Sequence, residues 1–329
     1  MGDVVEKFCI GVNGAKVRYI SDIPLLNYYI KNNDYMEFYN AKVIEDSSDI
    51  EYTVEYRDVS DKSNPVEVVG KKMIIRYPKE ELTESIILYM GFHFLEKQFG
   101  EMGLCSCHSA CVSKDGKATL LVGEAGAGKT SLAVNLCNNY GYSLISNDMT
   151  LIGKENDTIY AYGGTKFINL RLLSVKSNMP FLLYLFENSN KDSWTNKISL
   201  MARDIDIREE YNRLPIENVL FIHVDNRDKY KESNGDSWRN NFLMYQNTSS
   251  HIRGTAATFI DKKGYPIGYI PSFETKETYE KRIDLINTIN GLKNYKYVSG
   301  SLEEIIDLIN KLNGIKKDIR ILERKNENG

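Results

Sequence analysis

The fold is decided by one stretch, Gly123-Glu124-Ala125-Gly126-Ala127-Gly128-Lys129-Thr130, which has the Walker A form G-x-x-x-x-G-K-[ST]. Its glycines let successive backbone N–H groups turn toward phosphate oxygens, and Lys129 adds a positive charge. The hydroxyl of Thr130 is suited to hold Mg²⁺. The stretch, together with Ser131 directly after it, therefore predicts a binding site for the phosphates of a nucleotide.

The residues on either side favour a strand before the loop and a helix after it. Residues 118–122 form a short apolar run that suits a buried parallel strand, and residues 130–136 have helical composition and spacing. A helix beginning at the loop adds unpaired N–H groups and a partial positive charge to the anion site. A second strand is expected at residues 142–145, and strand–helix–strand predicts a parallel pair.

Composition narrows the class of protein. The chain has 329 residues, and because a single core usually stops growing near ~250 to 300 residues, two domains are expected. The net charge is −3 and the 42 Lys and Arg are spread out, so no basic field for nucleic acid exists. No apolar run approaches the ~20 residues that span a bilayer, and no signal peptide is recognisable. We expect a soluble, cytoplasmic protein without nucleic-acid or membrane partners.

The five cysteines are an odd, uneven set, which indicates reduced thiols rather than a disulfide framework. One group, Cys105, Cys107, His108 and Cys111, raises the question of zinc. Along a strand the odd-numbered positions share one face and His108 points to the other. This arrangement does not suit a tetrahedral ion, so the pattern favours small buried residues on a core strand.

Residues 1–100 indicate an α+β domain that would recognise substrate. Period-two alternation at residues 15–20, 51–56 and 72–77 predicts half-buried, mostly antiparallel strands. From position 79 the period changes, and a helix that ends near Gly100 is expected to bridge to the second domain.

Residues 101–314 indicate an α/β domain. Further strands are predicted at residues 158–162 and 218–225, and the polar residues 227–240 are predicted to form a surface loop. Ser301-Leu302-Glu303-Glu304 has the form of a capping box before a last helix. Charges dominate residues 315–329, which predicts a mobile tail.

Phosphoryl transfer also needs a carboxylate beside the phosphates, and two acids follow predicted strands. Asp148 follows the strand next to the loop, where the crevice of a parallel sheet forms. Asp225 ends the apolar strand in the manner of a Walker B acid, although an Asp there is also typical of a turn. Asp148 is the stronger candidate.

The stretch from His108 to Asp148 resembles HPr kinase/phosphorylase and its relatives. His108 precedes Gly123 by fifteen positions, and the loop is followed by a helix, by Gly141 and by a strand ending at Asn147-Asp148. It is most similar to outlying members from peptide natural-product (RiPP) gene clusters, such as lasso-peptide kinases. Looser similarity extends over residues 105–312, whereas residues 1–100 do not match the N-terminal domain of HPr kinases. The resemblance implies a P-loop domain of the HPr-kinase-like or PEP-carboxykinase-like class.

The resemblance also implies Mg²⁺-dependent transfer of a phosphoryl group from ATP, or a similar donor, to a hydroxyl. His108, Asn147 and Asp148 would lie around the acceptor, and Thr130 and Asp148 would hold the metal ion. Where the family usually has two adjacent acids this chain has Asn147-Asp148, and because an Asn cannot accept a proton, Asp148 must then be the base. Ser131 stands where HPr kinases have a Glu, which again favours the outlying branch.

Two cations complete the predicted site. Arg171 and Lys197 are candidates for stabilising the transferring phosphoryl oxygens, the alternative being surface or salt-bridge positions. The leading hypothesis is a kinase acting on a Ser or Thr hydroxyl of a peptide or small protein. A kinase for small-molecule hydroxyls and a nucleotide-binding regulatory protein without transfer remain alternatives. The family tends to assemble, so a homo-oligomer is compatible with the resemblance.

Overall fold

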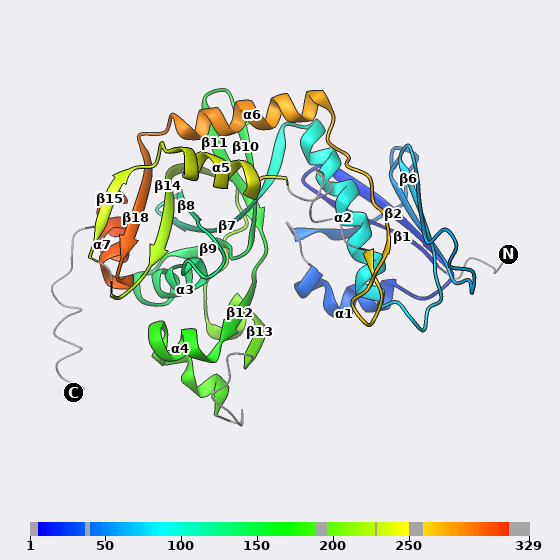
Figure 1. Cartoon of the computed structure of the whole chain (residues 1–329), viewed down its shortest axis with the longest axis horizontal. Helices are drawn as coiled ribbons and strands as arrows, with labels where there is room; N and C mark the ends of the chain where they lie inside the picture. Colours follow the sequence, from blue (N-terminus) through cyan, green and yellow to red (C-terminus); the bar gives the residue numbers. More distant parts are fainter. Residues whose placement is uncertain (1–5, 37–39, 188–195, 228, 250–258, 316–329) are drawn as a thin grey trace.

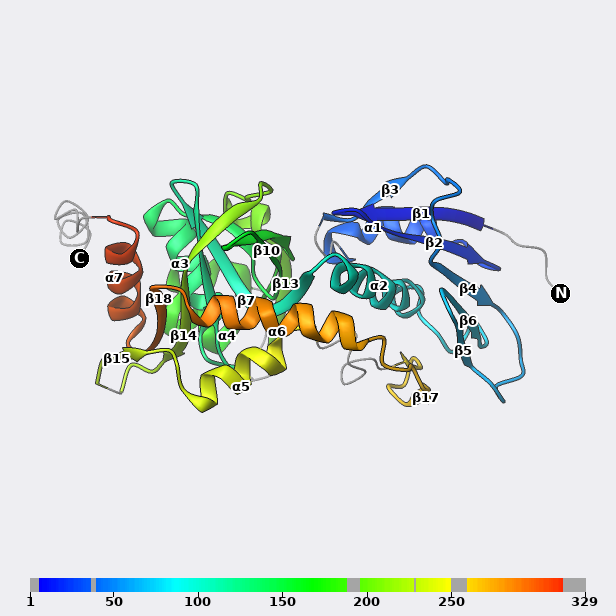
Figure 2. The ribbon, with the colours of Figure 1, turned by 90° about the horizontal axis from the view of Figure 1, so that it is seen from above.

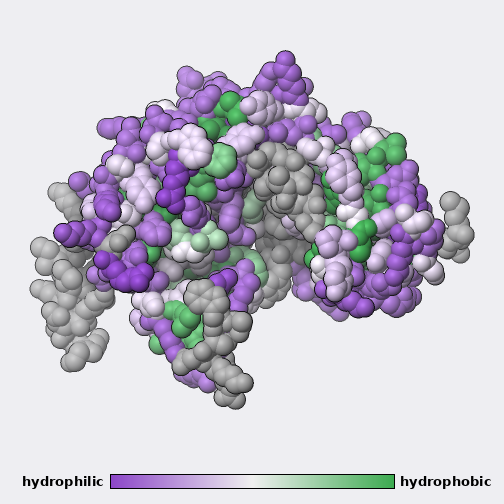
Figure 3. All heavy atoms as spheres, in the orientation of Figure 1, coloured by the Kyte–Doolittle hydropathy of each residue, from purple (hydrophilic) through white to green (hydrophobic). Residues whose placement is uncertain are grey.

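The computed structural model describes residues 6–36, 40–187, 196–227, 229–249 and 259–315. The chain is mixed α/β, with a six-stranded sheet at its N-terminal end and an eight-stranded sheet beyond it (Figure 1). Hydrophilic residues cover most of the face seen in Figure 3, and apolar residues show there only as separate patches. Within the described ranges, no helix is both long and apolar enough to cross a membrane.

The six-stranded sheet has the order β3-β1-β2-β4-β6-β5. Its strands are β1 (Glu6–Val12), β2 (Ala15–Ser21), β3 (Lys42–Ile44), β4 (Thr53–Arg57), β5 (Val66–Val69) and β6 (Lys72–Arg76). The outer pairs are antiparallel, but β4 runs parallel to both β2 and β6. Three of the five pairings are therefore antiparallel, as predicted, and the two pairings made by β4 are the exceptions. Alternation of buried residues reports which face is covered and not the direction of the neighbouring strand.

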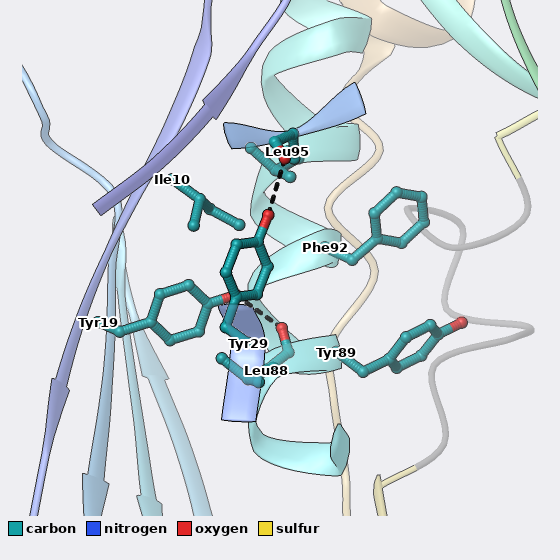
Figure 4. A pocket seen from close by; sticks show the side chains of 8 residues that line it. Ile10, Tyr19, Tyr29, Leu88, Tyr89, Phe92 and Leu95 are labelled. Carbon is teal, nitrogen blue, oxygen red and sulfur yellow. Dashed lines mark hydrogen bonds between the residues drawn. The ribbon is translucent and has the colours of Figure 1, made fainter. Parts of the chain in front are cut away.

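Helix α2 (Glu84–Glu101) packs on this sheet together with α1 (Leu26–Met36). The Tyr19 hydroxyl donates a hydrogen bond to the Leu88 carbonyl at 2.6 Å, across the contact between β2 and α2 (Figure 4). Gly91 permits this approach, because a Cβ there would lie 2.0 Å from the Tyr19 hydroxyl oxygen. The gap in Figure 4 has a volume of about 20 Å³, room for about one water, so it is a packing gap and not a ligand pocket.

The eight-stranded sheet follows the path β11-β10-β7-β8-β14-β18-β15, with β9 paired to β7 beside it. Its strands are β7 (Leu104–Lys114), β8 (Lys117–Val122), β9 (Ser143–Ser146), β10 (Met149–Glu155), β11 (Thr158–Gly164), β14 (Leu214–Val224), β15 (Lys231–Asn234) and β18 (Asn294–Gly300). In its centre, β8 runs parallel to β14, and β14 runs parallel to β18. The predicted strands at 118–122, 142–145, 158–162 and 218–225 are all present, within a few residues.

The predicted pairing of β8 with β9 was wrong. The two strands run in the same direction, but β7 lies between them and is antiparallel to both. Asp115 and Gly116 connect β7 to β8, both with positive φ, and Lys114 pairs directly with Lys117. This tight hairpin occupies one edge of β8 and β14 occupies the other, so β9 pairs with β7 instead.

Helices cover both faces of the eight-stranded sheet (Figure 2). α3 (Lys129–Tyr140), α4 (Leu172–Asn178) and α7 (Leu302–Leu312) pack on the face to which Leu121 points. α5 (Trp238–Asn247) and α6 (Lys276–Asn290) pack on the opposite face, with Leu120 and Val122. The central strand β8 is apolar on both faces for this reason. Two 3₁₀ helices, η2 (Pro180–Phe186) and η3 (Ala202–Ile205), and the hairpin of β12 (Phe167–Arg171) with β13 (Lys197–Met201) lie outside the sheet.

A late segment of the chain returns to the six-stranded sheet. It contains the short hairpin of β16 (Phe259–Ile260) and β17 (Pro266–Gly268), which lies beside α2 in Figure 1. Phe259, Ile270 and Phe273 are buried in the same core as β1, β2 and α2. The N-terminal core is therefore completed by residues that lie more than 150 positions later in the sequence.

Two predictions concern the C-terminal part. The capping box is confirmed: Ser301 and Glu304 exchange hydrogen bonds at the start of α7. The surface loop predicted at 227–240 was wrong, since β15 pairs with β18 and α5 begins at Trp238. All four residues of β15 are exposed, so this edge strand carries no apolar pattern that a sequence could show. Residues 316–329, the predicted mobile tail, lie outside the described residues.

Candidate active site

The glycine-rich loop at residues 123–128 joins β8 to α3, as the sequence predicted. Gly126 and Gly128 have φ values of 83° and 94°, in the left-handed region that glycine adopts without strain. A Cβ on Gly128 would lie 2.4 Å from the side chain of Val224, at the end of β14. The N–H of Val224 donates to the Ala127 carbonyl at 2.9 Å, so β14 holds the loop in place.

The start of α3 offers unused donors to this loop. The first helical hydrogen bond runs from the Leu132 N–H to the Gly128 carbonyl, so the N–H groups of residues 129–131 precede the helical ladder. Such groups, together with the helix dipole, favour an anion. The hydroxyl-bearing Thr130 is partly exposed here, whereas Ser131 is buried.

The ammonium of Lys129 is held inside the loop. Lys129 is 8% exposed, and Nζ donates to the carbonyls of Gly123 at 2.8 Å and Glu124 at 3.2 Å. Burial lowers the pKa of Lys129, and the negative charge of Asp148 acts in the opposite direction by raising it. Lys129 and Asp148 are therefore electrostatically coupled.

His108 and Asp148 are in direct contact. His108 lies on β7 opposite Met149, and Asp148 lies in the short connection between β9 and β10. The distance from His108 Nε2 to Asp148 Oδ1 is 3.2 Å, and the side chains are 40% and 55% exposed. The N–H of Ser109 donates to the Asp148 carbonyl at 3.0 Å, which fixes the corner against β7. Two residues 40 positions apart thus meet at the solvent-facing end of the sheet.

Asn147 has a different environment from Asp148. It is 5% exposed, its Nδ2 donates to the Phe167 carbonyl at 3.1 Å, and its Oδ1 is buried without a hydrogen-bond partner among the described residues. Its backbone N–H donates to the Thr165 carbonyl. The Asn147 side chain therefore joins the β9–β10 connection, Asn147-Asp148, to β12. Of these two residues, only Asp148 is exposed to solvent.

Thr165 supports the same corner and was missed by the sequence analysis. Its Oγ1 accepts hydrogen bonds from the N–H groups of Asp148 at 3.1 Å and Met149 at 3.0 Å. Beneath lies a buried hydroxyl cluster in which Thr150 Oγ1 is 2.7 Å from Ser109 Oγ and 2.5 Å from Ser146 Oγ. Single hydroxyl residues on separate strands have no sequence spacing that would reveal them.

A second supporting contact links the loop to α5. Arg239 forms an ion pair of 2.8 Å with Glu124, and it lowers the pKa of that carboxyl group. Both side chains are largely exposed, so the contact contributes little to stability. It nevertheless places α5 at the edge of the glycine-rich loop, a proximity that the sequence did not indicate.

Arg171 and Lys197 lie opposite one another on the hairpin of β12 and β13, and both are exposed. No hydrogen bond or ion pair joins either side chain to the glycine-rich loop within the described part of the chain. Asp225 follows β14, where its Oδ1 accepts a hydrogen bond from the Arg227 N–H at 2.9 Å, and contacts with Arg227 lower its pKa. This geometry is that of a turn-forming Asp, the alternative that the sequence left open.

All five cysteines are free and buried. Burial raises the pKa of Cys107 and Cys137 to about 12. Cys105, Cys107 and Cys111 share one face of β7 and are buried, as the sequence pattern predicted, in the core between the sheet and helices α5 and α6. Among the residues with described positions, no three His, Cys, Asp or Glu side chains are grouped as metal ligands.

Comparison with known proteins gives a limited result. No family model matches the chain, and no curated protein matches its sequence. Among solved structures 58 chains match, and one of them is the Hpr(Ser) kinase/phosphatase from Coxiella burnetii. That match is 15% identical, covers 39% of this chain and 76% of that chain, and has a TM-score of 0.24. A similarity of this size does not establish a family or an activity.

Proposed function

We propose that the chain is an ATP-dependent kinase of the HPr-kinase-like class, which phosphorylates a Ser or Thr hydroxyl of a peptide or small protein. One observation carries the proposal: His108, which contacts Asp148, precedes Ser109, and Ser109 pairs with Val122 at the start of the glycine-rich loop. The negative charge of Asp148 also raises the pKa of Lys129, against the effect of burial. Phosphoryl transfer requires phosphate-binding groups and a carboxylate near the acceptor in one site. The peptide acceptor rests on the sequence resemblance alone.

The residues of the loop fit a nucleoside triphosphate with Mg²⁺. The N–H groups of residues 129–131 and the ammonium of Lys129 suit phosphate oxygens. The Thr130 hydroxyl and the Asp148 carboxylate are oxygen ligands of the kind that Mg²⁺ prefers. When bound, the metal ion would neutralise negative charge on the phosphates. On binding, Lys129 Nζ would donate hydrogen bonds to phosphate oxygens instead of the carbonyls of Gly123 and Glu124. The negative phosphate would then balance the positive charge of the ammonium.

Asp148 is proposed as the base that accepts the proton of the acceptor hydroxyl. Its side chain is 55% exposed, whereas the neighbouring Asn147 is buried and bonded to Phe167. His108, when protonated on Nε2, donates to Asp148 Oδ1 and orients the carboxylate. The Asn in place of an acid at 147 is thus compatible with transfer. Arg171 and Lys197 remain proposed phosphoryl-stabilising cations, a role that requires their hairpin to approach the loop.

The test is phosphoryl transfer from Mg·ATP, measured as ADP release and as mass gain on panels of peptides and metabolites. We expect peptide phosphorylation, lost in Lys129→Ala together with nucleotide binding. Asp148→Asn should retain nucleotide binding but slow transfer by roughly 10²- to 10⁴-fold, the usual contribution of a general base. Asp225→Asn is the matched control, because its carboxyl is engaged in a turn, and it should keep near-normal activity.

Three results would contradict the proposal. If Asp148→Asn leaves the rate of phosphoryl transfer unchanged, Asp148 is not the base. Turnover that occurs only with metabolites would favour a small-molecule kinase. Nucleotide binding without any transfer in the unmodified protein would favour a nucleotide-binding regulatory protein.

A further inference from the structure

A cleft lies between helices α3 and α7, and α4 with η2 closes its outer side. Its volume is about 640 Å³, within the roughly 300 to 1,000 Å³ range of small-molecule sites. Asn135 and Asn139 line it from α3, Asn178 and Phe181 from the α4–η2 segment, and Asn226 and Ser301 from the ends of β14 and β18. Four separate parts of the chain thus converge on one hollow.

The cleft and the His108–Asp148 pair lie on opposite flanks of the glycine-rich loop. In the sheet, β8 has β7, which carries His108, on one side and β14 followed by β18 on the other. Asn226 follows Asp225, whose N–H donates to the Gly300 carbonyl, next to Ser301. The loop itself contacts β14 through Val224. A linear ligand that crosses the loop from Asp148 therefore arrives at the cleft.

The distance from Lys129 to the cleft is suitable for one nucleotide. Asn135 comes six residues after Lys129 on α3, which corresponds to about 9 Å along the helix at 1.5 Å per residue. This is within the span of a nucleoside triphosphate whose terminal phosphate is at Lys129. The hollow is therefore near enough to hold the other end of the molecule that the loop would bind.

The chemistry of the lining indicates a neutral, hydrogen-bonding group with an apolar face. The lining includes one carboxylate, Glu303, and no Lys, Arg or His, so it does not suit phosphate. Among the described residues, the side-chain amides of Asn178 and Asn226 have no hydrogen-bond partner and remain available to a ligand. Phe181 and Ile306 provide apolar surface beside them. Amides next to an aromatic ring suit a nucleobase and its ribose.

We propose that this cleft binds the nucleoside part of the nucleotide whose phosphates occupy the glycine-rich loop. The inference rests on the proposed function, because it requires a nucleotide at the loop. It adds a location and a set of residues for base recognition, on the flank away from the acceptor. It also predicts that the acceptor reaches Asp148 without entering the cleft.

The experiment compares Mg·ATP with inorganic tripolyphosphate, which has phosphates but no nucleoside, by titration calorimetry. Ser177→Trp fills the cleft from an exposed position of α4, and Asn226→Ala removes one free amide. Both should weaken Mg·ATP by about tenfold or more while tripolyphosphate affinity stays unchanged. Leu173→Trp, at an exposed position of the same helix that does not line the cleft, is the control and should bind both ligands normally.

Unchanged tripolyphosphate binding also shows that each variant is folded. If Ser177→Trp and Asn226→Ala bind Mg·ATP as the unmodified protein does, the cleft is not the nucleoside site, and the proposed kinase function is untouched. If the unmodified protein binds neither ligand, both the inference and the proposed function fail.

Discussion

At the scale of single residues, Asn147 and Asp148 show how neighbours in sequence can have separate tasks. The corner after β9 turns the Asn147 side chain inward to Phe167 and leaves Asp148 beside His108. Asn147 is 5% exposed, whereas the Asp148 side chain is 55% exposed, so only Asp148 of the two is accessible to an acceptor. The change from acid to amide at 147 therefore falls on the buried, structural member of the pair.

Lys129 should lose its charge at a lower pH than an ordinary lysine. Burial disfavours its ammonium and lowers its pKa below the ordinary value of 10.5, while Asp148 partly offsets this. Above the lowered pKa the free protein holds a neutral amine, so Mg·ATP affinity should fall as the pH rises through that point. Asp148→Asn removes the offsetting charge, so the decline should begin at a still lower pH. Affinity measured against pH in both proteins checks this.

Lys129→Arg is the control, because a guanidinium stays charged across the whole range. Its affinity should show no such alkaline decline, whatever its absolute strength. A decline of the same midpoint in Lys129→Arg, or an unchanged midpoint in Asp148→Asn, would show that another group titrates.

At the scale of elements, the strand–loop–helix unit could be predicted from sequence because its signals are local. Glycines, an apolar run and a helical pattern stand next to each other between residues 117 and 140. The same local signals could not predict that β7 lies between β8 and β9. Strand order depends on which strands occupy each edge of a neighbour, and those strands can be far apart in the sequence. The Asp115-Gly116 turn was the available signal for a β7–β8 hairpin. The candidate site requires both the strand–loop–helix unit and this position of β7, because β7 brings His108 to Asp148.

Gly128→Ala should distort the glycine-rich loop. Its φ of 94° is unfavourable for alanine, and the new Cβ would lie 2.4 Å from the Val224 side chain, whose own backbone is bonded to Ala127. We expect loss of nucleotide binding and a decrease of roughly 1 to 3 kcal/mol in the free energy of unfolding. Calorimetry and denaturant titration measure the two effects.

Gly126→Ala separates backbone strain from the clash. Gly126 has a similar φ of 83°, but a Cβ there would meet no atom within 4 Å. Gly126→Ala should lower the free energy of unfolding by only about 1 to 2 kcal/mol, the penalty for an alanine in the left-handed region. If Gly126→Ala and Gly128→Ala lower the free energy of unfolding equally, the contact with Val224 does not determine the conformation of the loop.

At the scale of the whole molecule, the two sheets are joined by more than the chain connection at residue 103. Helix α2 packs on β2 and β4 and also on β7 and α6. The segment at residues 259–273 adds Phe259 and Phe273 to the N-terminal core. The change of sequence pattern near residue 100 predicts a boundary there. No local pattern assigns residues 259–273 to the N-terminal core, because long-range packing leaves no periodicity in the sequence.

Phe273→Ala should therefore destabilise the N-terminal core from a position far along the chain. Phe273 is 8% exposed and its ring packs against Phe94 of α2, with 5.4 Å between ring centroids. Truncating a buried Phe typically costs about 3 to 5 kcal/mol. Urea unfolding should show this loss, and hydrogen exchange should show it in α2 and β2 as well as around residue 273. Tyr269→Ala, at a site that is 80% exposed, is the control and should change stability by about 0.5 kcal/mol or less. If exchange in Phe273→Ala increases only around residue 273 and not in α2, the returning segment is an appendage, and the six-stranded sheet is stable without it.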